Sequence, residues 1–261
     1  MGTNVAKHQL TVAVLGLGEA GSRFANDLAE RGVRVLGWDP APRRELHPAV
    51  TLAANNAEAA RDADIVLSVN LSSAAETVAV EVLPVLTARH IYGELNTTSP
   101  AKKQVVAALL RPSGAHVVDV AIMAPVPPKG ILTPLLLSGP GAAAMAELLL
   151  PLDLEIVVLN GPVGEAATRK LLRSIVYKGV AAVIGEAVAA GRSFGLEDYI
   201  RAQISSVIGG NDALIDRFLE GSRTHALRRT HEMEAVVEML QGQHVAPVVS
   251  QATLTSLLNL C

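Results

Sequence analysis

Residues 11–39 read TVAVLGLGEAGSRFANDLAERGVRVLGWD, and this stretch decides the fold. A run of β-branched and apolar residues leads into a glycine-rich turn. An Ala-rich segment follows, and a second apolar run ends at Asp39. This order predicts a strand, a tight turn, a helix and a second strand. The stretch therefore predicts one βαβ unit of a doubly wound α/β sheet.

The glycines of the turn have the spacing G-x-G-x-x-G. In that pattern Gly16 permits the tight turn, Gly18 lets the backbone approach a pyrophosphate, and Gly21 lets the helix pack closely on the strand. The helix N-terminus supplies N–H groups and a positive dipole end for phosphates. The context between strand and helix favours a dinucleotide site over a purely structural turn. The predicted cofactor residues of this loop are Gly16, Leu17, Gly18, Glu19, Ala20 and Gly21.

Asp39 lies 23 residues after Gly16, near the spacing expected for a carboxylate that binds a ribose. Such a carboxylate accepts hydrogen bonds from ribose hydroxyls and repels a 2′-phosphate, which favours NAD. Arg43 and Arg44 follow closely. They are either a solvated surface pair or contacts for the 2′-phosphate of NADP. We therefore predict that the cofactor is NAD or NADP and favour NAD.

Beyond this unit, short apolar runs alternate with longer Ala-rich stretches. Runs that are apolar throughout are typical of parallel strands buried on both faces. The fold class predicted is an α/β, Rossmann-like doubly wound sheet followed by a smaller all-helical C-terminal domain. Strands are expected at residues 10–15, 33–38, 64–69, 90–95, 116–122, 135–138 and 155–159, and helices at 20–31, 54–61, 73–83 and 100–110.

The pattern changes at residues 160–164, NGPVG, which is a turn signal. Residues 165–191 are predicted to form one long helix, because Val, Ile and Leu recur there at helical spacing. The rest is expected to be helical, with breaks at Gly195, at residues 209–210 and at Gly221. This predicts a Rossmann-like NAD(P)-binding domain over 1–160. A helical substrate and dimerisation domain would cover 161–261. The long helix is apolar on much of its surface, so a homodimer that buries it is expected.

The composition excludes several classes of partner. The 261 residues include 22 basic and 25 acidic side chains, giving a net charge of −3 without a long basic run. We therefore expect no nucleic acid partner and no membrane surface partner. No uninterrupted apolar run of 18 residues is present, so no membrane span is expected. The single cysteine, Cys261, favours a cytoplasmic location, and the scattered histidines predict no metal site.

Five segments, taken in order, resemble the β-hydroxyacid dehydrogenase superfamily. This group includes 3-hydroxyisobutyrate dehydrogenase, 6-phosphogluconate dehydrogenase and the imine reductases. The resemblance covers nearly the whole chain and points to a branch of small proteins with a shortened C-terminal helical domain. Besides the cofactor loop, the segments are residues 64–70 (DIVLSVN), 94–100 (ELNTTSP), 119–126 (DVAIMAPV) and 161–174, which contains GPVG and KLLRS.

This resemblance implies an NAD(P)-dependent oxidoreductase that transfers a hydride between a nicotinamide and a small hydroxy or keto substrate. Lys170 is the implied general acid and base, and Ser174 occupies the position of a family asparagine. Asn70, Asn96 and Thr97 would flank the nicotinamide. The implied substrate residues are Met123, Ala124 and Pro125, at the family's substrate loop, and His231, where the family has a Lys-Asp-Leu segment.

Lys170 shares one side of the predicted helix with Ser174, Tyr177 and Lys178. A lysine transfers protons near neutral pH when burial or a neighbouring cation lowers its pKa. The alternative is a solvated lysine in a surface cluster with the neighbouring arginines. His231 has a similar alternative on a charged helix face. Arg228 and Arg229 are candidate contacts for a carboxylate or phosphate of the substrate.

The departures from the family pattern bear on the substrate. The family's substrate loop reads Ser-Gly-Gly, whereas Met123 offers no donor and Pro125 has no N–H. Ser174 reaches less far than the asparagine it replaces. Two alternatives therefore stay open: reduction of a C=N bond as in imine reductases, and an NAD(P)-binding dimer that performs no chemistry.

Overall fold

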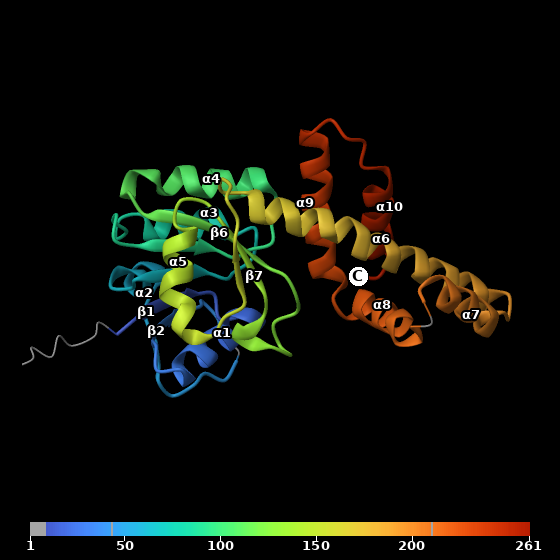
Figure 1. Cartoon of the computed structure of the whole chain (residues 1–261), viewed down its shortest axis with the longest axis horizontal. Helices are drawn as coiled ribbons and strands as arrows, with labels where there is room; N and C mark the ends of the chain where they lie inside the picture. Colours follow the sequence, from blue (N-terminus) through green and yellow to red (C-terminus); the bar gives the residue numbers. More distant parts are fainter. Residues whose placement is uncertain (1–8, 43, 210) are drawn as a thin grey trace, which may run out of the picture. The chain divides into compact units, whose positions relative to one another are not determined.

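The computed structural model describes residues 9–42, 44–209 and 211–261 (Figure 1). The chain divides into two compact units, the first ending at Thr168 and the second running from Arg169 to Cys261. Residues 161–168, which the sequence pattern predicts to belong to the helical domain, fall in the first unit by this division.

The first unit is built on one sheet of eight strands in the order β3-β2-β1-β4-β5-β6-β7-β8. Neighbouring strands are parallel except β6 and β7, which are antiparallel. The α/β class predicted from the sequence is confirmed. The strands are β1 (Thr11–Leu15), β2 (Arg34–Trp38), β3 (Val50–Leu52), β4 (Ile65–Ser68), β5 (Ile91–Glu94), β6 (His116–Ile122), β7 (Leu135–Ser138) and β8 (Ile156–Val158).

Helices cover both faces of this sheet (Figure 1). Buried residues of α1 and α5 pack in one hydrophobic cluster, and those of α2, α3 and α4 pack in a second. In β1, Val12 and Val14 belong to the first cluster and Ala13 and Leu15 to the second, as the alternation of side chains along a strand requires. The helices are α1 (Glu19–Glu30), α2 (Asn56–Arg61), α3 (Ala75–Val82), α4 (Pro100–Leu110) and α5 (Ala142–Leu149).

Two elements of this unit were not predicted. Strand β3 has only three residues, all of them exposed or half-buried, so it carries no apolar pattern. Helix α5 follows Gly141, and its Ala-rich stretch lacked a clear period. The antiparallel pairing of β7 with β6 was not foreseen either, because the strands' apolar runs do not encode direction.

The chain order creates a switch point at the centre of the sheet. From β1 the chain passes to β2 on one side, and β4 then pairs with β1 on the other. In open α/β sheets, ligands bind outside the carboxyl ends of the strands at such a point. The loops after β1 and β4 are therefore the expected location of a bound ligand.

The second unit contains most of α6 (Glu165–Ser193) and the helices α7 (Glu197–Val207), α8 (Asp212–Thr224), α9 (Ala226–Gly242) and α10 (Val248–Leu258). It has two hydrophobic cores. One joins α6 to α9 and α10 around Leu171, Met233 and Leu254. The other joins α6 to α8 around Ile184 and Phe218. The prediction of one long helix is confirmed, as is the helical character of the remainder.

The predicted break at Gly221 was wrong. Helix α8 continues through Gly221 and ends at Thr224. A Cβ at position 221 would lie 2.7 Å from the guanidinium of Arg229. The glycine therefore makes room for a neighbouring side chain within a helix, and it does not end that helix.

Helix α6 has 29 residues and is long and apolar enough to cross a membrane by length and composition. No span is expected from the sequence, because it contains no uninterrupted apolar run of 18 residues. A core helix of a soluble protein passes the same test, and α6 contributes Leu171, Ala181 and Ile184 to the cores of its unit. In its most apolar window, however, only 28% of the residues are buried. Much of the apolar surface of α6 is thus exposed in the single chain.

Candidate functional site

The glycine loop after β1 contacts the end of β4. Gly16 has a φ of 99°, a left-handed conformation that side chains rarely adopt. Its N–H donates a hydrogen bond to the carbonyl of Trp38 at 2.8 Å. A Cβ at Gly16 would overlap the carbonyl oxygen of Val69 and lie 3.0 Å from Cα of Asn70. The loop therefore lies directly against the residues that follow β4, at the switch point.

Gly18 and Gly21 meet different surroundings. A Cβ at Gly21 would overlap the carbonyl oxygen of Gly16, so packing of the helix against the loop requires a glycine there. A Cβ at Gly18 would meet no atom of the described residues within 4 Å. Protein packing thus does not explain the absence of a side chain at Gly18. The open space beside it fits the close approach of a pyrophosphate.

The N-terminus of α1 faces this loop without a side-chain cap. Gly18 is the N-cap residue, and no side chain in the described part of the chain accepts a hydrogen bond from the first turn. The N–H groups of that turn suit phosphate oxygens. Glu19 adds a negative charge in this turn and lies 4.0 Å from the guanidinium of Arg44, with both side chains exposed.

Asp39 lies immediately after β2, where the sequence predicts a ribose ligand. Its Oδ2 accepts a hydrogen bond from the N–H of Leu17 at 2.8 Å, and its Oδ1 accepts one from the N–H of Ala41 at 2.8 Å. Each carboxylate oxygen has a second lone pair, so ribose hydroxyls are able to donate to the same group. Arg43, the predicted contact for a 2′-phosphate, lies outside the described residues.

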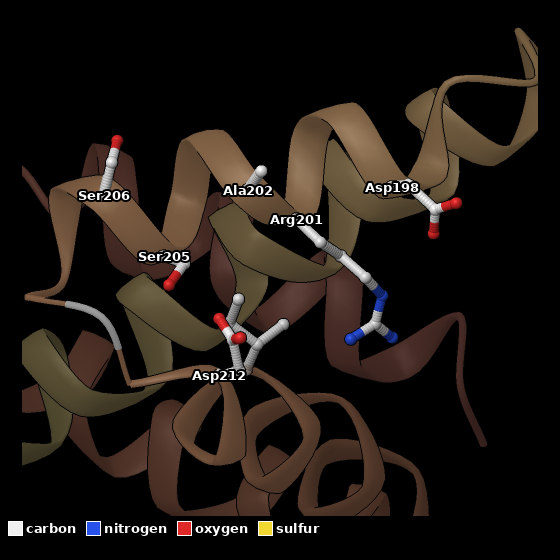
Figure 2. A pocket seen from close by; sticks show the side chains of 7 residues that line it. Asp198, Arg201, Ala202, Ser205, Ser206 and Asp212 are labelled. Atoms are coloured by element: carbon white, nitrogen blue, oxygen red, sulfur yellow. The ribbon is translucent and has the colours of Figure 1, made fainter.

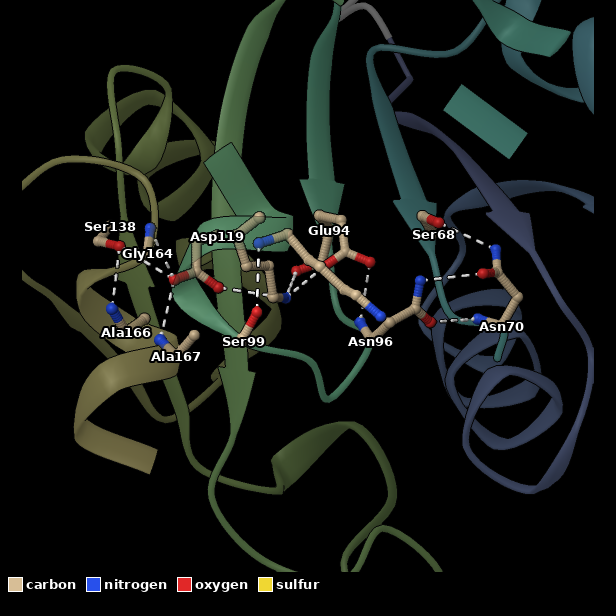
Figure 3. A network of polar contacts seen from close by, with 12 residues as sticks. Ser68, Asn70, Glu94, Asn96, Ser99, Asp119, Ser138, Gly164, Ala166 and Ala167 are labelled. Atoms are coloured by element: carbon tan, nitrogen blue, oxygen red, sulfur yellow. Dashed lines mark hydrogen bonds and ion pairs between the residues drawn. The ribbon is translucent and has the colours of Figure 1, made fainter. Parts of the chain in front are cut away.

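Asn70 and Asn96 form a reciprocal pair across the ends of β4 and β5, here called the amide pair (Figure 3). The backbone N–H of Asn70 donates to Oδ1 of Asn96 at 2.7 Å, and Nδ2 of Asn96 donates to Oδ1 of Asn70 at 2.9 Å. Nδ2 of Asn70 also donates to Oγ of Ser68 at 2.9 Å. The structure therefore brings together two predicted cofactor residues that are 26 positions apart. Thr97, the third, follows them and is half-buried.

Three buried charged residues behind the amide pair were missed by the sequence analysis. Glu94, Lys103 and Asp119, here called the buried triad, are 1%, 2% and 0% exposed. Nζ of Lys103 forms ion pairs with the carboxylates of Glu94 and Asp119. Burial raises the pKa of Glu94, and the charge of Lys103 opposes this. No sequence motif distinguishes Lys103, because it lies among the polar residues 102–104 of a predicted helix, where lysines are usually solvated.

The predicted substrate loop follows β6. The N–H of Met123 donates to the carbonyl of Pro134 at 2.9 Å, and its side chain packs on a small apolar cluster. Ala124 is half-buried and Pro125 is exposed. Further along the loop, the N–H of Ile131 donates to the buried carboxylate of Asp27 in α1 at 2.8 Å. The loop is therefore anchored to the helix that carries the glycine motif.

In the second unit, Ser174 and Lys178 of α6 meet Glu232 of α9. Nζ of Lys178 lies 2.6 Å from Oε1 of Glu232 and 3.2 Å from Oγ of Ser174, and Oγ of Ser174 also hydrogen-bonds Glu232. Ser174 and Glu232 are buried. The predicted polar side of the long helix thus has an acidic partner on α9. We call Ser174, Lys178 and Glu232 the Glu232 cluster.

The electrostatics of the Glu232 cluster include Lys170. Burial alone would raise the pKa of Glu232, but the charges of Lys178 and Lys170 outweigh it and hold the pKa at about 2. Burial lowers the pKa of Lys178, while Glu232 opposes this and Arg229 and Arg228 add to it. Glu232 is therefore ionised at neutral pH. It supplies a fixed negative charge beside the predicted general acid and base.

His231 is exposed on α9, whereas its neighbour Glu232 is buried. In the family-like segment at residues 231–233, the side chain that makes hydrogen bonds with α6 is therefore Glu232 and not His231. The sequence carries no signal for Glu232, because a glutamate on a helix with several charges is usually solvated.

A separate pocket of about 510 Å³ lies in the second unit between α7 and α8 (Figure 2). Arg201 at its wall pairs with Asp216 at 2.8 Å and with Glu197 at 3.2 Å. None of the predicted site residues lines this pocket. Its lining residues are Asp198, Arg201, Ala202, Ser205, Ser206, Asp212 and Ile215.

Comparison with known families matches residues 11–126 to the NAD-binding domain of 6-phosphogluconate dehydrogenase. This range includes the glycine loop, Asp39 and the amide pair. Over these residues the first unit is similar to that NAD-binding domain. Residues 192–257 match a domain of unknown function, DUF1932.

Two relatives without an assigned function are also similar to this chain. An uncharacterized 28.5 kDa protein from the 7S RNA 5′ region of Methanothermus fervidus is 26% identical over 164 residues, which is 62% of this chain. The match spans 63% of that relative, less than two thirds of its length. The solved structure of the conserved protein MTH1747 is 27% identical, with a TM-score of 0.77 and 96% of both chains covered. Its description reports structural similarity with 3-hydroxyacid dehydrogenases.

A dehydrogenase of known type shares the fold. The 3-hydroxyisobutyrate dehydrogenase of Mycobacterium tuberculosis, solved with L-serine, has a TM-score of 0.76 and 18% identity, with 95% of this chain and 92% of that chain covered. The combination of an NAD-binding domain with an all-helical second unit is therefore the fold of these dehydrogenases. Within the described residues, no group of three or more His, Cys, Asp or Glu is placed to hold a metal ion.

Proposed function

We propose that the protein is an NAD(P)-dependent oxidoreductase that transfers a hydride between a nicotinamide and a carbon bearing oxygen in a small hydroxy or keto substrate. The observation that carries the proposal is the glycine loop. Gly16 and Gly21 are required by the backbone around them, whereas Gly18 borders open space at the switch point of the sheet. That arrangement fits a bound dinucleotide, and packing within the protein does not explain the glycine at position 18.

The NAD-binding domain would hold the cofactor through four features. The first turn of α1 would bind the pyrophosphate and Asp39 the adenosine ribose. The amide pair and Thr97 would flank the nicotinamide. When bound, the cofactor supplies or accepts the hydride. The carboxylate of Asp39 favours NAD over NADP, because it would repel a 2′-phosphate.

Lys170 would move the proton that accompanies the hydride. Reduction of a carbonyl adds a hydride to carbon and a proton to oxygen, and oxidation of the alcohol reverses both steps. A lysine ammonium is able to give that proton and its amine to take it back. Glu232 would stabilise the charged form of Lys170, since the two groups interact electrostatically. Ser174 would act beside Lys170 as a hydrogen-bonding group.

Met123, Ala124, Pro125 and His231 are proposed as substrate contacts. The apolar side chain at Met123 and the missing N–H of Pro125 make this loop less polar than Ser-Gly-Gly. That difference favours, as a second candidate, the reduction of a cyclic imine, where no substrate carboxylate has to be held. Arg228 and Arg229 are the candidate contacts if the substrate carries an anionic group.

We expect the protein to act as a cytoplasmic homodimer without a nucleic acid or membrane partner. The exposed apolar side chains of α6 support self-association. Leu172, Val176 and Val183 are 50%, 66% and 67% exposed, and they recur at intervals that place them along one side of the helix. An exposed apolar stripe of this kind suits burial against a second copy.

The decisive experiment has two stages. Fluorescence titration with NADH and NADPH tests cofactor binding, and keto acids and cyclic imines are then offered side by side to the reduced cofactor. Lys170→Ala is compared with Arg169→Ala, its exposed neighbour. Turnover that is lost in Lys170→Ala but kept in the control, with binding intact in both, supports the proposal. Tight binding without turnover of any substrate would favour an NAD(P)-binding dimer without catalysis.

A further inference from the structure

We propose that Lys103 is a positioning residue of the NAD-binding domain. Its buried ammonium, acting through Glu94 and Asp119, holds the amide pair and the first turn of α6 in one arrangement. The inference rests on the proposed function, because it takes the amide pair to lie at the nicotinamide half of the cofactor. It assigns a role to a residue that no sequence motif marks.

The surroundings of Lys103 are unusual for a lysine. Lysine is almost never fully buried unless it is paired, and Lys103 is 2% exposed. Nζ lies 3.2 Å from Oδ1 of Asp119, donates to the backbone carbonyl of Glu94 at 2.7 Å and contacts the Glu94 carboxylate. Among the described residues, Oε2 of Glu94 and Oδ1 of Asp119 have no polar partner other than the Lys103 ammonium, which forms an ion pair with each of them. The cation is therefore central to the buried triad.

One branch of contacts runs from Lys103 to the cofactor loop. The second oxygen of Glu94, Oε1, accepts a hydrogen bond from the backbone N–H of Asn96 at 3.2 Å. Asn96 in turn makes two hydrogen bonds with Asn70, as Figure 3 shows. Cα of Asn70 lies against Gly16 of the loop. The orientation of Glu94 thus sets the backbone position from which the amide pair is built.

The other branch runs from Lys103 to the start of α6. Oδ2 of Asp119 accepts hydrogen bonds from the N–H groups of Gly164 at 3.1 Å and Ala167 at 2.9 Å (Figure 3). The N–H of Ala166 donates to Oγ of Ser138 at 3.1 Å. These are groups that a helix leaves unsatisfied at its N-terminus, where negative charge is also favourable. Asp119 therefore caps the helix that contains Lys170.

The charges explain why a cation is needed between the branches. Burial by itself lowers the pKa of Lys103, but Glu94 and Asp119 outweigh it and raise the pKa above its usual value. Lys103 thus stays charged at neutral pH. Without it, two carboxylates would share a dry site, and one would take up a proton or turn away. Either change would displace the Glu94 oxygen that accepts a hydrogen bond from Asn96, or the Asp119 carboxylate that caps α6.

The test separates the two halves of the dinucleotide. ADP has only the adenosine and the two phosphates, which the glycine loop and Asp39 would hold, whereas NADH also has the nicotinamide half that would lie beside the amide pair. Lys103→Met is compared with Lys102→Met, the exposed neighbour on the same helix. Where the wild type prefers NADPH, the 2′-phosphorylated forms replace both ligands. Hydrogen exchange of the peptide at 160–170 reports on the first turn of α6.

For Lys103→Met we expect the Kd for NADH to rise about tenfold, which is the loss of roughly one hydrogen bond, while the Kd for ADP stays within about twofold. Exchange at 160–170 should become faster in the same variant. Lys102→Met should change none of these. A merely destabilised domain would weaken both ligands alike, and that result would overturn the inference, as would unchanged NADH binding or unchanged exchange.

Glu94→Gln keeps the test decisive if Lys103→Met does not fold. The glutamine has nearly the same volume but only one acceptor oxygen, so either Asn96 or Lys103 loses its partner. We expect the same selective weakening of NADH binding relative to ADP binding, at about threefold or more. Equal binding of NADH by Glu94→Gln and wild type would reject the role of the buried triad. A wild type that binds ADP and NADH but turns over no substrate would leave this inference standing and reject the proposed reaction.

Discussion

The carboxylate of Asp39 and the backbone N–H of Leu17 are joined by a hydrogen bond of 2.8 Å. The residue that follows β2 is thereby joined to the glycine loop that follows β1. The same carboxylate has the position expected for a ribose ligand. Asp39 therefore has two roles, one in holding the loop and one in choosing the cofactor, and substitutions separate them.

Asp39→Asn should shift the cofactor preference toward NADPH. The amide oxygen is still able to accept from Leu17, but the negative charge that repels a 2′-phosphate is gone. We expect the ratio of Kd values, NADPH over NADH, to fall by about tenfold, which corresponds to 1.4 kcal/mol. Fluorescence titration of both nucleotides measures it, with Glu30→Gln, at an exposed position on α1, as control. An unchanged ratio would show that Asp39 does not contact the ribose.

Gly18→Ala should weaken cofactor binding without destabilising the fold. No described atom lies within 4 Å of the added Cβ, so the melting temperature should stay within about 2 °C of wild type. The methyl group would occupy the space of the pyrophosphate, and the Kd for NADH should rise at least about tenfold. Gly242→Ala is the matched control, because its Cβ also meets nothing within 4 Å of the described chain. Normal NADH binding by Gly18→Ala would place the ligand elsewhere.

Lys170→Met should lose turnover while cofactor binding remains. General acid and base catalysis by a placed side chain contributes roughly a hundred- to ten-thousandfold, so kcat should fall within that range. Steady-state kinetics with the best substrate, together with NADH titration, check this. A variant that keeps its kcat would exclude Lys170 as the proton donor, and Lys178 of the Glu232 cluster would be the next candidate.

Glu232→Gln should destabilise the second unit at neutral pH. The pKa of Glu232 is held at about 2, below its ordinary value of 4.5, so its charge stabilises the folded state above pH 4.5. That contribution is of the order of 3 kcal/mol and is lost as the pH falls from about 4.5 toward 2. The difference in free energy of unfolding between wild type and Glu232→Gln, measured by urea unfolding, should become smaller as the pH falls over this range. Glu234→Gln, exposed on the same helix, should show no such difference.

Charges on the apolar stripe of α6 should disrupt self-association. Val176→Glu together with Val183→Glu places two carboxylates on side chains that are 66% and 67% exposed in the single chain. We expect the wild type to sediment as a dimer and this variant as a monomer, because burying an unpaired charge is costly. Val80→Glu, 53% exposed on α3, is the control. A wild type that is monomeric at micromolar concentration contradicts the proposal.

Sequence patterns predicted the elements whose signals are local. The apolar run before Gly16, the glycine spacing and the run ending at Asp39 defined the βαβ unit, because strand, turn and helix each leave a period or a spacing in consecutive residues. The long helix after Gly164 was predicted for the same reason. The three-residue strand β3 and the continuation of α8 through Gly221 were not, because neighbouring residues in space decide them.

The polar sites are formed by residues that are far apart in the chain, so only the tertiary structure decides their contacts. Asn70 and Asn96 were named from sequence, but their mutual hydrogen bonds follow from the pairing of β4 with β5. Lys103 and Glu232 carried no local signal, since a lysine or glutamate on a helix is usually solvated. Only the packing of α4 against the sheet and of α9 against α6 buries them. Burial is what turns these ordinary charges into fixed partners, because a charge removed from water must find its compensation within the protein.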